Sequence, residues 1–345
     1  MGRIGTNISY GGGIPITGLQ SLGISAVRVV AHKPEDDTAY FEQLRQAGIR
    51  IWLTMASESF AGFDNWPDAF DEYRRRYFSL VDWWEAGNEP DIVSDSSWTL
   101  APGTYERLLL TARDRLGPDA KISAGGLASG LPGWLAGDEP EWVNRFRSHE
   151  LKVTSALAHY DWNEHNKPVN LDWVNGIAIH PYGQSPGLPF PESQGGPFGR
   201  VDHKVREYRD WLDAHRPDKS LHITEWGAPV KDFEPRPPSP PDTVEAPEDF
   251  GDYIRRIKAQ PAAQASAPDE IGGGPLGSPE ARAGQAEYIG NMVRTLVRLD
   301  AVGDAIQFCY SDRMVEQFGL TDRDFNGLAA QDAFLLALSQ TPVNV

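Results

Sequence analysis

The sequence predicts a single closed (β/α)₈ barrel, and three observations lead to that fold class. Short apolar runs alternate with longer amphipathic stretches along all 345 residues. The apolar runs number eight, which is the number of strands that closes such a barrel. A chain of this length can also fold as one α/β barrel without a second domain. We therefore expect residues 1–345 to form one barrel.

The candidate strands are short, rich in Val, Ile, Leu, Trp and Ala, and followed by turn or loop signals. In chain order they are residues 3–9, 26–31, 49–54, 83–86, 121–124, 176–179, 221–224 and 305–308. The stretches between them carry apolar residues at helical spacing. The candidate helices include residues 36–46, 66–80, 103–116, 141–159, 202–215, 279–299 and 328–338.

An open, doubly wound sheet is the structural alternative to the barrel. Such a sheet normally carries a Gly-rich phosphate-binding turn directly after its first strand. The run Gly11-Gly12-Gly13 lies near that place but lacks the required spacing. We interpret it as a flexible turn, and the barrel remains the favoured fold.

The segments after the sixth and seventh strands are long and rich in Pro and Gly, at residues 181–200 and 228–278. Insertions collect in the loops at the carboxyl ends of barrel strands. We interpret residues 228–278 as a lid or wall of a cleft within the barrel, with a short helix near residues 249–258. The alternative is a disordered segment that extends away from the barrel, which its composition also allows.

The composition is that of an acidic globular protein, with a net charge of −17 and 40% hydrophobic residues. Nucleic acids and anionic membranes are bound by basic patches, so we expect neither as a partner. No run approaches the ~18 apolar residues of a membrane span. The charge fits a neutral substrate.

The sequence does not determine the cellular compartment of the protein. Cys309 is the single cysteine, so the chain has no internal disulfide. The first residues form no apolar signal segment. An extracellular location would therefore require that the chain is a trimmed or excised domain.

The sequence predicts no cofactor and no metal site. The histidines show no ligand spacing such as His-Glu-x-x-His. Residues 322–327 resemble the start of a calcium loop, but the twelfth position is Ala333 where such a loop needs Glu. We interpret this stretch as a plain turn before the last helix.

Two glutamates stand out because each follows an apolar strand and precedes a turn signal. Glu89 lies in the run Gly87-Asn88-Glu89-Pro90 after the fourth strand, and Glu225 lies in Thr224-Glu225-Trp226-Gly227 after the seventh. Residues at the carboxyl ends of barrel strands converge on one pocket. Two carboxylates that face one cleft are the groups that cleave a glycosidic bond.

Other polar and aromatic residues occur at the ends of the predicted strands and suit a sugar site. They are Arg28 in strand two, Asn88 after strand four, His180 and Tyr182 after strand six, Trp226 after strand seven, and Gln307 and Tyr310 at strand eight. Arg28 needs a partner because arginine is almost never buried unpaired. His222 is one position out of phase with Glu225, so strand alternation predicts a structural role on the opposite face.

These motifs resemble those of glycoside hydrolase clan A. The resemblance spans about residues 3–338 and is most specific at Gly87-Asn88-Glu89-Pro90, His180-Pro181-Tyr182 and Thr224-Glu225-Trp226-Gly227. Within the clan the chain is similar to family 39, partly through Phe318-Gly319-Leu320-Thr321-Asp322. Families 5, 51 and 79 share much of the pattern.

The resemblance implies a role for each site residue. Glu89 matches the general acid/base, which has to keep a proton near neutral pH, and Glu225 matches the nucleophile, which has to be ionised beside a cation such as Arg28. Asn88 matches the residue that binds the sugar 2-hydroxyl. Tyr182 matches a tyrosine that bonds the nucleophile, and His180 lines the same pocket. A retaining mechanism implies carboxyl groups ~5–5.5 Å apart.

The sequence departs from the clan pattern at strand eight, where many members place a tryptophan under the sugar at the cleavage point. Phe308, Tyr310 and Trp226 are the candidates to replace it. This departure leaves the identity of the sugar open, together with its anomeric configuration and the choice between exo and endo attack.

We expect a retaining glycosidase that acts on a polysaccharide or its oligosaccharides. The alternative from another class is a non-catalytic carbohydrate-binding barrel in a larger assembly. A metal-dependent barrel hydrolase is a weaker third hypothesis, which insensitivity to a chelator would exclude.

Overall fold

The protein forms a closed barrel of eight parallel strands in the order β1 to β8. A computed structural model describes residues 3–8, 14–31, 38–55, 66–90, 102–127, 169–181, 196–227, 278–298, 303–307, 320 and 329–339. β1 pairs with β2 on one side and with β8 on the other, which closes the barrel. The predicted (β/α)₈ fold is therefore confirmed, and the open sheet is excluded.

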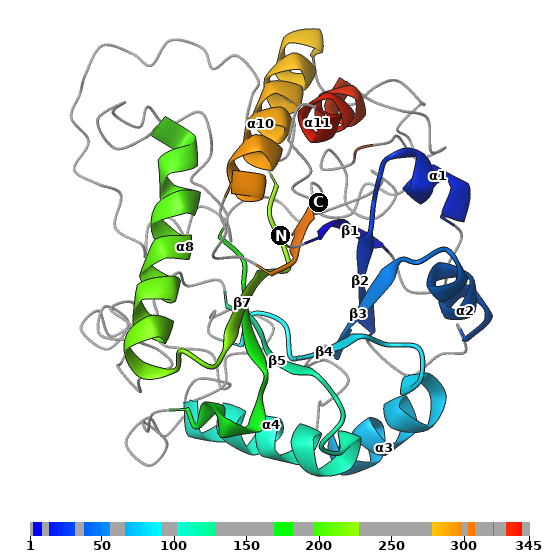
Figure 1. Cartoon of the computed structure of the whole chain (residues 1–345), viewed down its shortest axis with the longest axis vertical. Helices are drawn as coiled ribbons and strands as arrows, with labels where there is room; N and C mark the ends of the chain where they lie inside the picture. The colour runs from blue at the N-terminus through cyan, green and yellow to red at the C-terminus, as the bar shows by residue number, and fades with distance from the viewer. Residues whose placement is uncertain are drawn as a thin grey trace, which may run out of the picture.

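The strands lie at the centre of the molecule with the helices around them (Figure 1). The strands are β1 (Ile4–Ile8), β2 (Ala26–Ala31), β3 (Arg50–Met55), β4 (Trp83–Ala86), β5 (Ile122–Leu127), β6 (Gly176–Ile179), β7 (Ser220–Ile223) and β8 (Ala305–Gln307). Each lies within about three residues of its predicted range. β5 differs most, because its pairing with β6 shifts register between Ala124 and Leu127 and the strand continues past the predicted end.

The described helices follow the strands and cover the outer face of the barrel (Figure 1). They are α1 (Ile16–Ser21), α2 (Thr38–Gln46), α3 (Trp66–Tyr77), α4 (Pro102–Leu116), the 3₁₀ turn η4 (Leu171–Trp173), α8 (Gly196–His215), α10 (Pro279–Arg298) and α11 (Ala329–Ser339). α1 and η4 were not predicted. The predicted helix 141–159 lies outside the described residues, as does the predicted insertion 228–278 except for its last residue. Among the described helices, none has the length and apolarity to cross a membrane.

The outward face of the strands is apolar and packs on the helices. Alternate residues of most strands belong to the main hydrophobic core, as the fold requires. These residues include Val27, Val29, Ile51, Leu53, Ile177, Ile179, Leu221 and Ile223. Burial of this face against the helices is the main favourable contribution to folding.

The interior of the barrel is plugged by aromatic residues at its amino-terminal end. Trp52 and Trp83 stack with ring centroids 4.9 Å apart and an interplanar angle of 4°, and Ile306 completes this separate cluster. Trp52 Nε1 donates to the buried carboxylate of Asp304, 2.9 Å away. Since this end is filled, the opposite end of the barrel is the one that can hold a site, as is usual for the fold.

His222 of β7 lies in the same plug and is neutral. Its Nδ1 accepts from the backbone N–H of Asp304 at 3.0 Å, so that nitrogen carries no proton. Its other ring nitrogen, Nε2, bonds Ser220 Oγ at 2.7 Å. Burial lowers the pKa of His222 to about 4.

The sequence placed His222 on the face opposite Glu225, but the strand alternation does not extend that far. β7 ends at Ile223, and Thr224 still bonds a group inside the barrel. His222 therefore faces the barrel interior, below the level of the expected site.

Replacement of His222 by Gln should make the free energy of unfolding less dependent on pH in the acid range. The unfolded histidine titrates near 6.5 and the folded one near 4, so stability is lost as the pH falls through that window. Between pH 7 and pH 4.5 the wild type should lose about 2 kcal/mol of unfolding free energy more than His222→Gln. Urea unfolding at the two pH values measures this difference. His215→Gln, at an exposed position on α8, is the control and should follow the wild type.

Candidate active site

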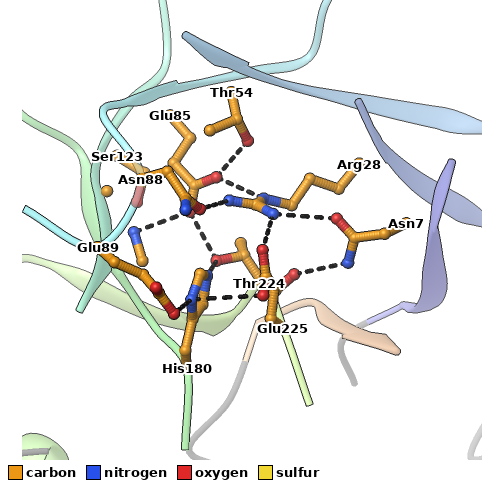
Figure 2. A network of polar contacts seen from close by, with 12 residues as sticks. Asn7, Arg28, Thr54, Glu85, Asn88, Glu89, Ser123, His180, Thr224 and Glu225 are labelled. Carbon is orange, nitrogen blue, oxygen red and sulfur yellow. Dashed lines mark hydrogen bonds and ion pairs between the residues drawn. The ribbon is translucent and has the colours of Figure 1, made fainter. Parts of the chain in front are cut away.

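Five of the residues predicted from the sequence meet at the carboxyl-terminal end of the barrel. They are Arg28 from β2, Asn88 and Glu89 after β4, His180 after β6 and Glu225 after β7. Their side chains point toward one another and form one polar network (Figure 2). Parallel strands bring their carboxyl ends to one rim, so residues far apart in the chain become neighbours.

Arg28 is the centre of the network and is completely buried. Its Nε donates to Glu85 at 2.6 Å, and its Nη2 donates to Asn88 Oδ1 at 2.7 Å. Its Nη1 donates to Asn7 Oδ1 at 3.0 Å and also to Glu225 Oε1. Burial by itself would lower the pKa of Arg28, but the carboxylates of Glu85 and Glu225 outweigh it and raise the pKa.

Glu85 of β4 is the buried partner that holds Arg28 in place. Each of its oxygens accepts two hydrogen bonds. Oε2 accepts from Arg28 Nε and Thr54 Oγ1, and Oε1 accepts from Thr224 Oγ1 at 2.6 Å and from Gly126 N at 3.0 Å. Burial favours the neutral acid, but Arg28 and these hydroxyls outweigh burial and lower the pKa of Glu85. Glu85 is therefore a fully satisfied carboxylate inside the barrel.

Four side chains of the network were not predicted from the sequence: Asn7, Thr54, Glu85 and Thr224. One signal could have found Glu85. In β4 the positions alternate, so Glu85 shares its face with Trp83 and must point into the barrel. A buried arginine requires a buried counter-charge, and Glu85 is an acidic residue inside a strand. Asn7, Thr54 and Thr224 carry no comparable signal in the sequence.

Asn88 is oriented by Arg28. The guanidinium can only donate, so the Asn88 atom that faces it must be the amide oxygen. The amide nitrogen is then the Asn88 side-chain atom that can donate a hydrogen bond. This orientation suits the predicted contact with a sugar hydroxyl.

One imidazole contacts both predicted catalytic carboxylates. His180 Nδ1 lies 2.9 Å from Glu89 Oε1 and 3.7 Å from Glu225 Oε2. Carboxylate oxygens of the two glutamates lie within 4.8 Å of each other. Burial by itself would lower the pKa of His180, but Glu225 and Glu89 outweigh it and raise the pKa above its ordinary value.

The two glutamates have different environments. The Glu89 side chain is 29% exposed and bonds His180, whereas the Glu225 side chain is 10% exposed and is paired with Arg28. The Glu89 backbone lies in the left-handed region with φ of 48°, which is rare for a residue other than glycine. Its N–H donates to Gly126 O at 3.1 Å and holds this turn. Such outliers occur where the surrounding structure fixes a functional group.

The remaining predicted residues do not join this network. Trp226 is completely buried in the main hydrophobic core, and this burial argues against a role as a stacking surface for sugar. Tyr182 and Tyr310 lie outside the described residues, so their predicted roles stay predictions. Gln307 accepts from Thr6 Oγ1 at 3.0 Å, and both side chains are buried.

Among the described residues, Glu89, His180 and Glu225 also form a group that could hold a metal ion, with ligand atoms within 4.8 Å. The guanidinium of Arg28 bonds Glu225 and carries a positive charge next to this group. A second cation would be repelled there. We therefore interpret Glu89, His180 and Glu225 as a group that binds and transfers a proton, and not as a metal site.

The fold and the paired carboxylates define a class of architecture. A closed (β/α)₈ barrel that presents one glutamate after β4 and another after β7 is built like the barrel glycosidases. Comparison of the sequence alone does not narrow this class, because no family model and no curated protein matches the chain.

The fold of the chain does match solved structures, and the following three are glycosidases. An endo-β-1,3-glucanase of GH128 (subgroup I) from Amycolatopsis mediterranei, in complex with laminaripentaose, is 16% identical with a TM-score of 0.54 over 97% of this chain and 99% of that chain. A GH39 β-xylosidase from Caulobacter crescentus is 15% identical with a TM-score of 0.54, over 99% and 72%. A β-glucuronidase from Bifidobacterium dentium is 11% identical with a TM-score of 0.54, over 99% and 46%.

At these identities the comparisons establish the shared fold. They agree with the resemblance to glycosidase barrels that the sequence motifs suggested. Family 39 is represented among the similar structures, and so is GH128. The chain spans nearly the whole of the glucanase but about half of the glucuronidase.

Gly126→Ala should disrupt the site because a side chain at Gly126 would overlap the imidazole of His180. Overpacking of this kind typically costs about 1–3 kcal/mol. Gly290→Ala in α10 is the control, since its nearest neighbour lies 3.5 Å from the new methyl group. That change should stabilise the helix by roughly 0.5–1 kcal/mol. Denaturant unfolding measures both, and equal effects would contradict the predicted packing of His180 on Gly126.

Proposed function

We propose that the protein is a retaining glycoside hydrolase, in which Glu89 is the general acid/base and Glu225 is the nucleophile. One observation carries the proposal. Glutamates from β4 and β7 place carboxylate oxygens within 4.8 Å of each other at the mouth of the barrel. Retaining enzymes separate their carboxyl groups by ~5–5.5 Å and inverting enzymes by ~6.5–9.5 Å. The short separation supports double displacement, because it leaves no room for a water molecule beside the sugar on the nucleophile's side.

The environments of the two glutamates support this assignment of roles. Glu225 is paired with Arg28, which places a positive charge beside the carboxylate that has to attack. Glu89 is more exposed and bonds an imidazole that can exchange a proton with it. A nucleophile has to be charged and an acid has to carry a proton, and the site provides a different partner for each need.

The first step forms a bond between a Glu225 oxygen and the anomeric carbon while the glycosidic bond breaks. Glu89 donates its proton to the leaving oxygen, so the leaving group departs as a neutral alcohol. Asn88 is oriented by Arg28 so that its amide nitrogen can hydrogen-bond the sugar 2-hydroxyl, and hydrogen bonds to that hydroxyl contribute to stabilisation of the transition state. The products are a glycosyl-enzyme ester and a Glu89 carboxylate.

The second step reverses the first with water as the acceptor. The Glu89 carboxylate removes a proton from water, the resulting oxygen attacks the anomeric carbon, and Glu225 leaves as a carboxylate. Two inversions at one carbon retain its configuration. Both glutamates return to their starting protonation states.

We infer a β-linked, uncharged glycan as the substrate class. The similar structures include a β-1,3-glucanase, a β-xylosidase and a β-glucuronidase, which all act on β-linked sugars. The net charge of −17 disfavours an anionic substrate. Among these examples, a glucan or xylan fragment therefore fits better than a glucuronide.

Glu225→Ala should abolish hydrolysis without unfolding the protein. The panel is the 4-nitrophenyl β-glucoside, β-xyloside and β-glucuronide, together with laminaripentaose. For the substrate that the wild type turns over, kcat/KM should fall on the order of 10⁴-fold or more, because no glycosyl-enzyme can form. Glu42→Ala, at an exposed position on α2, is the control and should retain wild-type rates. Full activity of Glu225→Ala would refute the assignment, as would wild-type product that NMR shows to be inverted.

Glu89→Ala should affect formation of the glycosyl-enzyme and its hydrolysis in different ways, which can be measured separately. Its kcat/KM should fall about 10²–10⁴-fold for a phenyl glycoside, since that leaving group needs the proton, and much less for a 2,4-dinitrophenyl glycoside. Azide should restore turnover by attacking the glycosyl-enzyme in place of water, and the glycosyl azide should keep the β configuration. An α-azide product would instead assign Glu89 as the nucleophile.

A further inference from the structure

Thr224 is the residue before the proposed nucleophile, and its hydroxyl connects two buried groups that sequence analysis did not relate. Oγ1 donates to Glu85 Oε1 at 2.6 Å and lies 3.2 Å from His180 Nε2. The side chain is completely buried. The chain of contacts runs from Glu85 through Thr224 and His180 to Glu89 (Figure 2).

The direction of each hydrogen bond in this chain follows from a count of hydrogens. Glu85 is ionised, so it can only accept. A threonine hydroxyl has one hydrogen, and in Thr224 that hydrogen is directed to Glu85. Toward His180, the oxygen of Thr224 can therefore only accept. The proton on that side belongs to His180 Nε2.

The other ring nitrogen of His180 then shares one proton with Glu89. With Nε2 protonated, a neutral imidazole has a lone pair on Nδ1, which accepts from a protonated Glu89 at 2.9 Å. If the proton moves across, Nδ1–H of an imidazolium donates to a Glu89 carboxylate. Both arrangements hold one proton between the same two atoms, and the total charge of the pair is unchanged.

We propose that Thr224 is a positioning residue for proton donation: it holds His180 in the Nε2–H form, so that His180 Nδ1 and Glu89 keep one shared proton for the leaving group. This inference rests on the proposed function of Glu89. It accounts for the proton that Glu89 has to donate, which the two carboxylates alone do not explain. In the free enzyme, the His180–Glu89 pair is the unit that loses this proton at alkaline pH.

The charges around His180 determine how firmly the pair retains the proton. Glu85 and Glu89 face it from β4 and the turn after it, Glu225 faces it from the end of β7, and Arg28 faces it from β2. The carboxylates outweigh both burial and the guanidinium and raise the pKa of His180. The proton is therefore retained to a higher pH than a histidine in water would allow.

Thr224→Val is the decisive change because it removes the hydroxyl and keeps the branched shape. The Nε2–H form loses its acceptor, and a neutral His180 can instead carry its proton on Nδ1 and donate to a Glu89 carboxylate. That state lacks the shared proton. The alkaline limb of kcat/KM for a phenyl β-glycoside should move to lower pH by about one unit, the equivalent of one hydrogen bond. For a 2,4-dinitrophenyl β-glycoside, which does not need the proton, the effect of the substitution should be much smaller.

Two further variants separate this role from simple loss of structure. Thr224→Ser keeps the hydroxyl, so the alkaline limb of its kcat/KM profile should lie at the same pH as in the wild type. Thr54→Val removes the matching hydroxyl from Oε2 of Glu85 without touching His180, so its limb should also stay in place although the protein is destabilised. An unshifted limb in Thr224→Val, or an equal shift in Thr54→Val, would overturn the proposal.

Nitrogen-15 NMR of histidine-labelled protein tests the tautomer without any substrate. The His180 signal, identified by its loss in His180→Gln, should show an Nε2–H imidazole in the wild type above its pKa and an Nδ1–H imidazole in Thr224→Val. An Nδ1–H tautomer in the wild type would refute the inference even if the enzyme is a glycosidase. Absence of turnover with every glycoside, together with an Nε2–H tautomer, would refute the proposed function and leave the tautomer assignment standing.

Discussion

The buried ion pair between Arg28 and Glu85 is the interaction on which the rest of the site depends. Both side chains have no exposed area, and two charges in that position are stable only if every donor and acceptor has a partner. Removal of one partner from such a pair typically costs about 3–5 kcal/mol. Because Arg28 also bonds Asn7, Asn88 and Glu225, the pair fixes a cation and three further polar side chains in one arrangement.

The barrel interior is divided along its axis, and this division makes the buried charges possible. The amino-terminal end is filled by Trp52, Trp83 and Ile306, which exclude water. Above them lies a polar layer of charges and hydroxyls, and above that layer is the rim with Glu89 and Glu225. Each level supports the next, since the plug closes the polar layer on one side and the polar layer orients the two glutamates at the rim.

The sequence predicted the barrel and the central residues of the site, because both depend on local patterns. Apolar runs mark strands wherever one face is buried, and a glutamate between a strand and a turn signal marks the rim. The role of Glu85 was not predicted because its partner, Arg28, is 57 positions away in the sequence. The stacking role predicted for Trp226 rested on its place beside Glu225, whereas the chain turns after β7 and buries the ring in the core. Partners from different strands become visible only when the strands are assembled.

The two rim glutamates differ in backbone conformation: Glu89 has a strained backbone and Glu225 does not, and the difference has a physical reason. A left-handed backbone at a residue with a side chain costs roughly 1–2 kcal/mol. At Glu89 this cost is offset by the bond from its N–H to Gly126 and by the contact of its carboxylate with His180. Glu225 lies two residues past the end of β7, and it is not among the described residues with a positive φ. The strain therefore lies on the residue to which we assign the role of general acid/base, which would have to face both a leaving group and a proton source. Gly126 makes that turn possible, because it accepts from the Glu89 backbone, donates to Glu85 and leaves room for the imidazole.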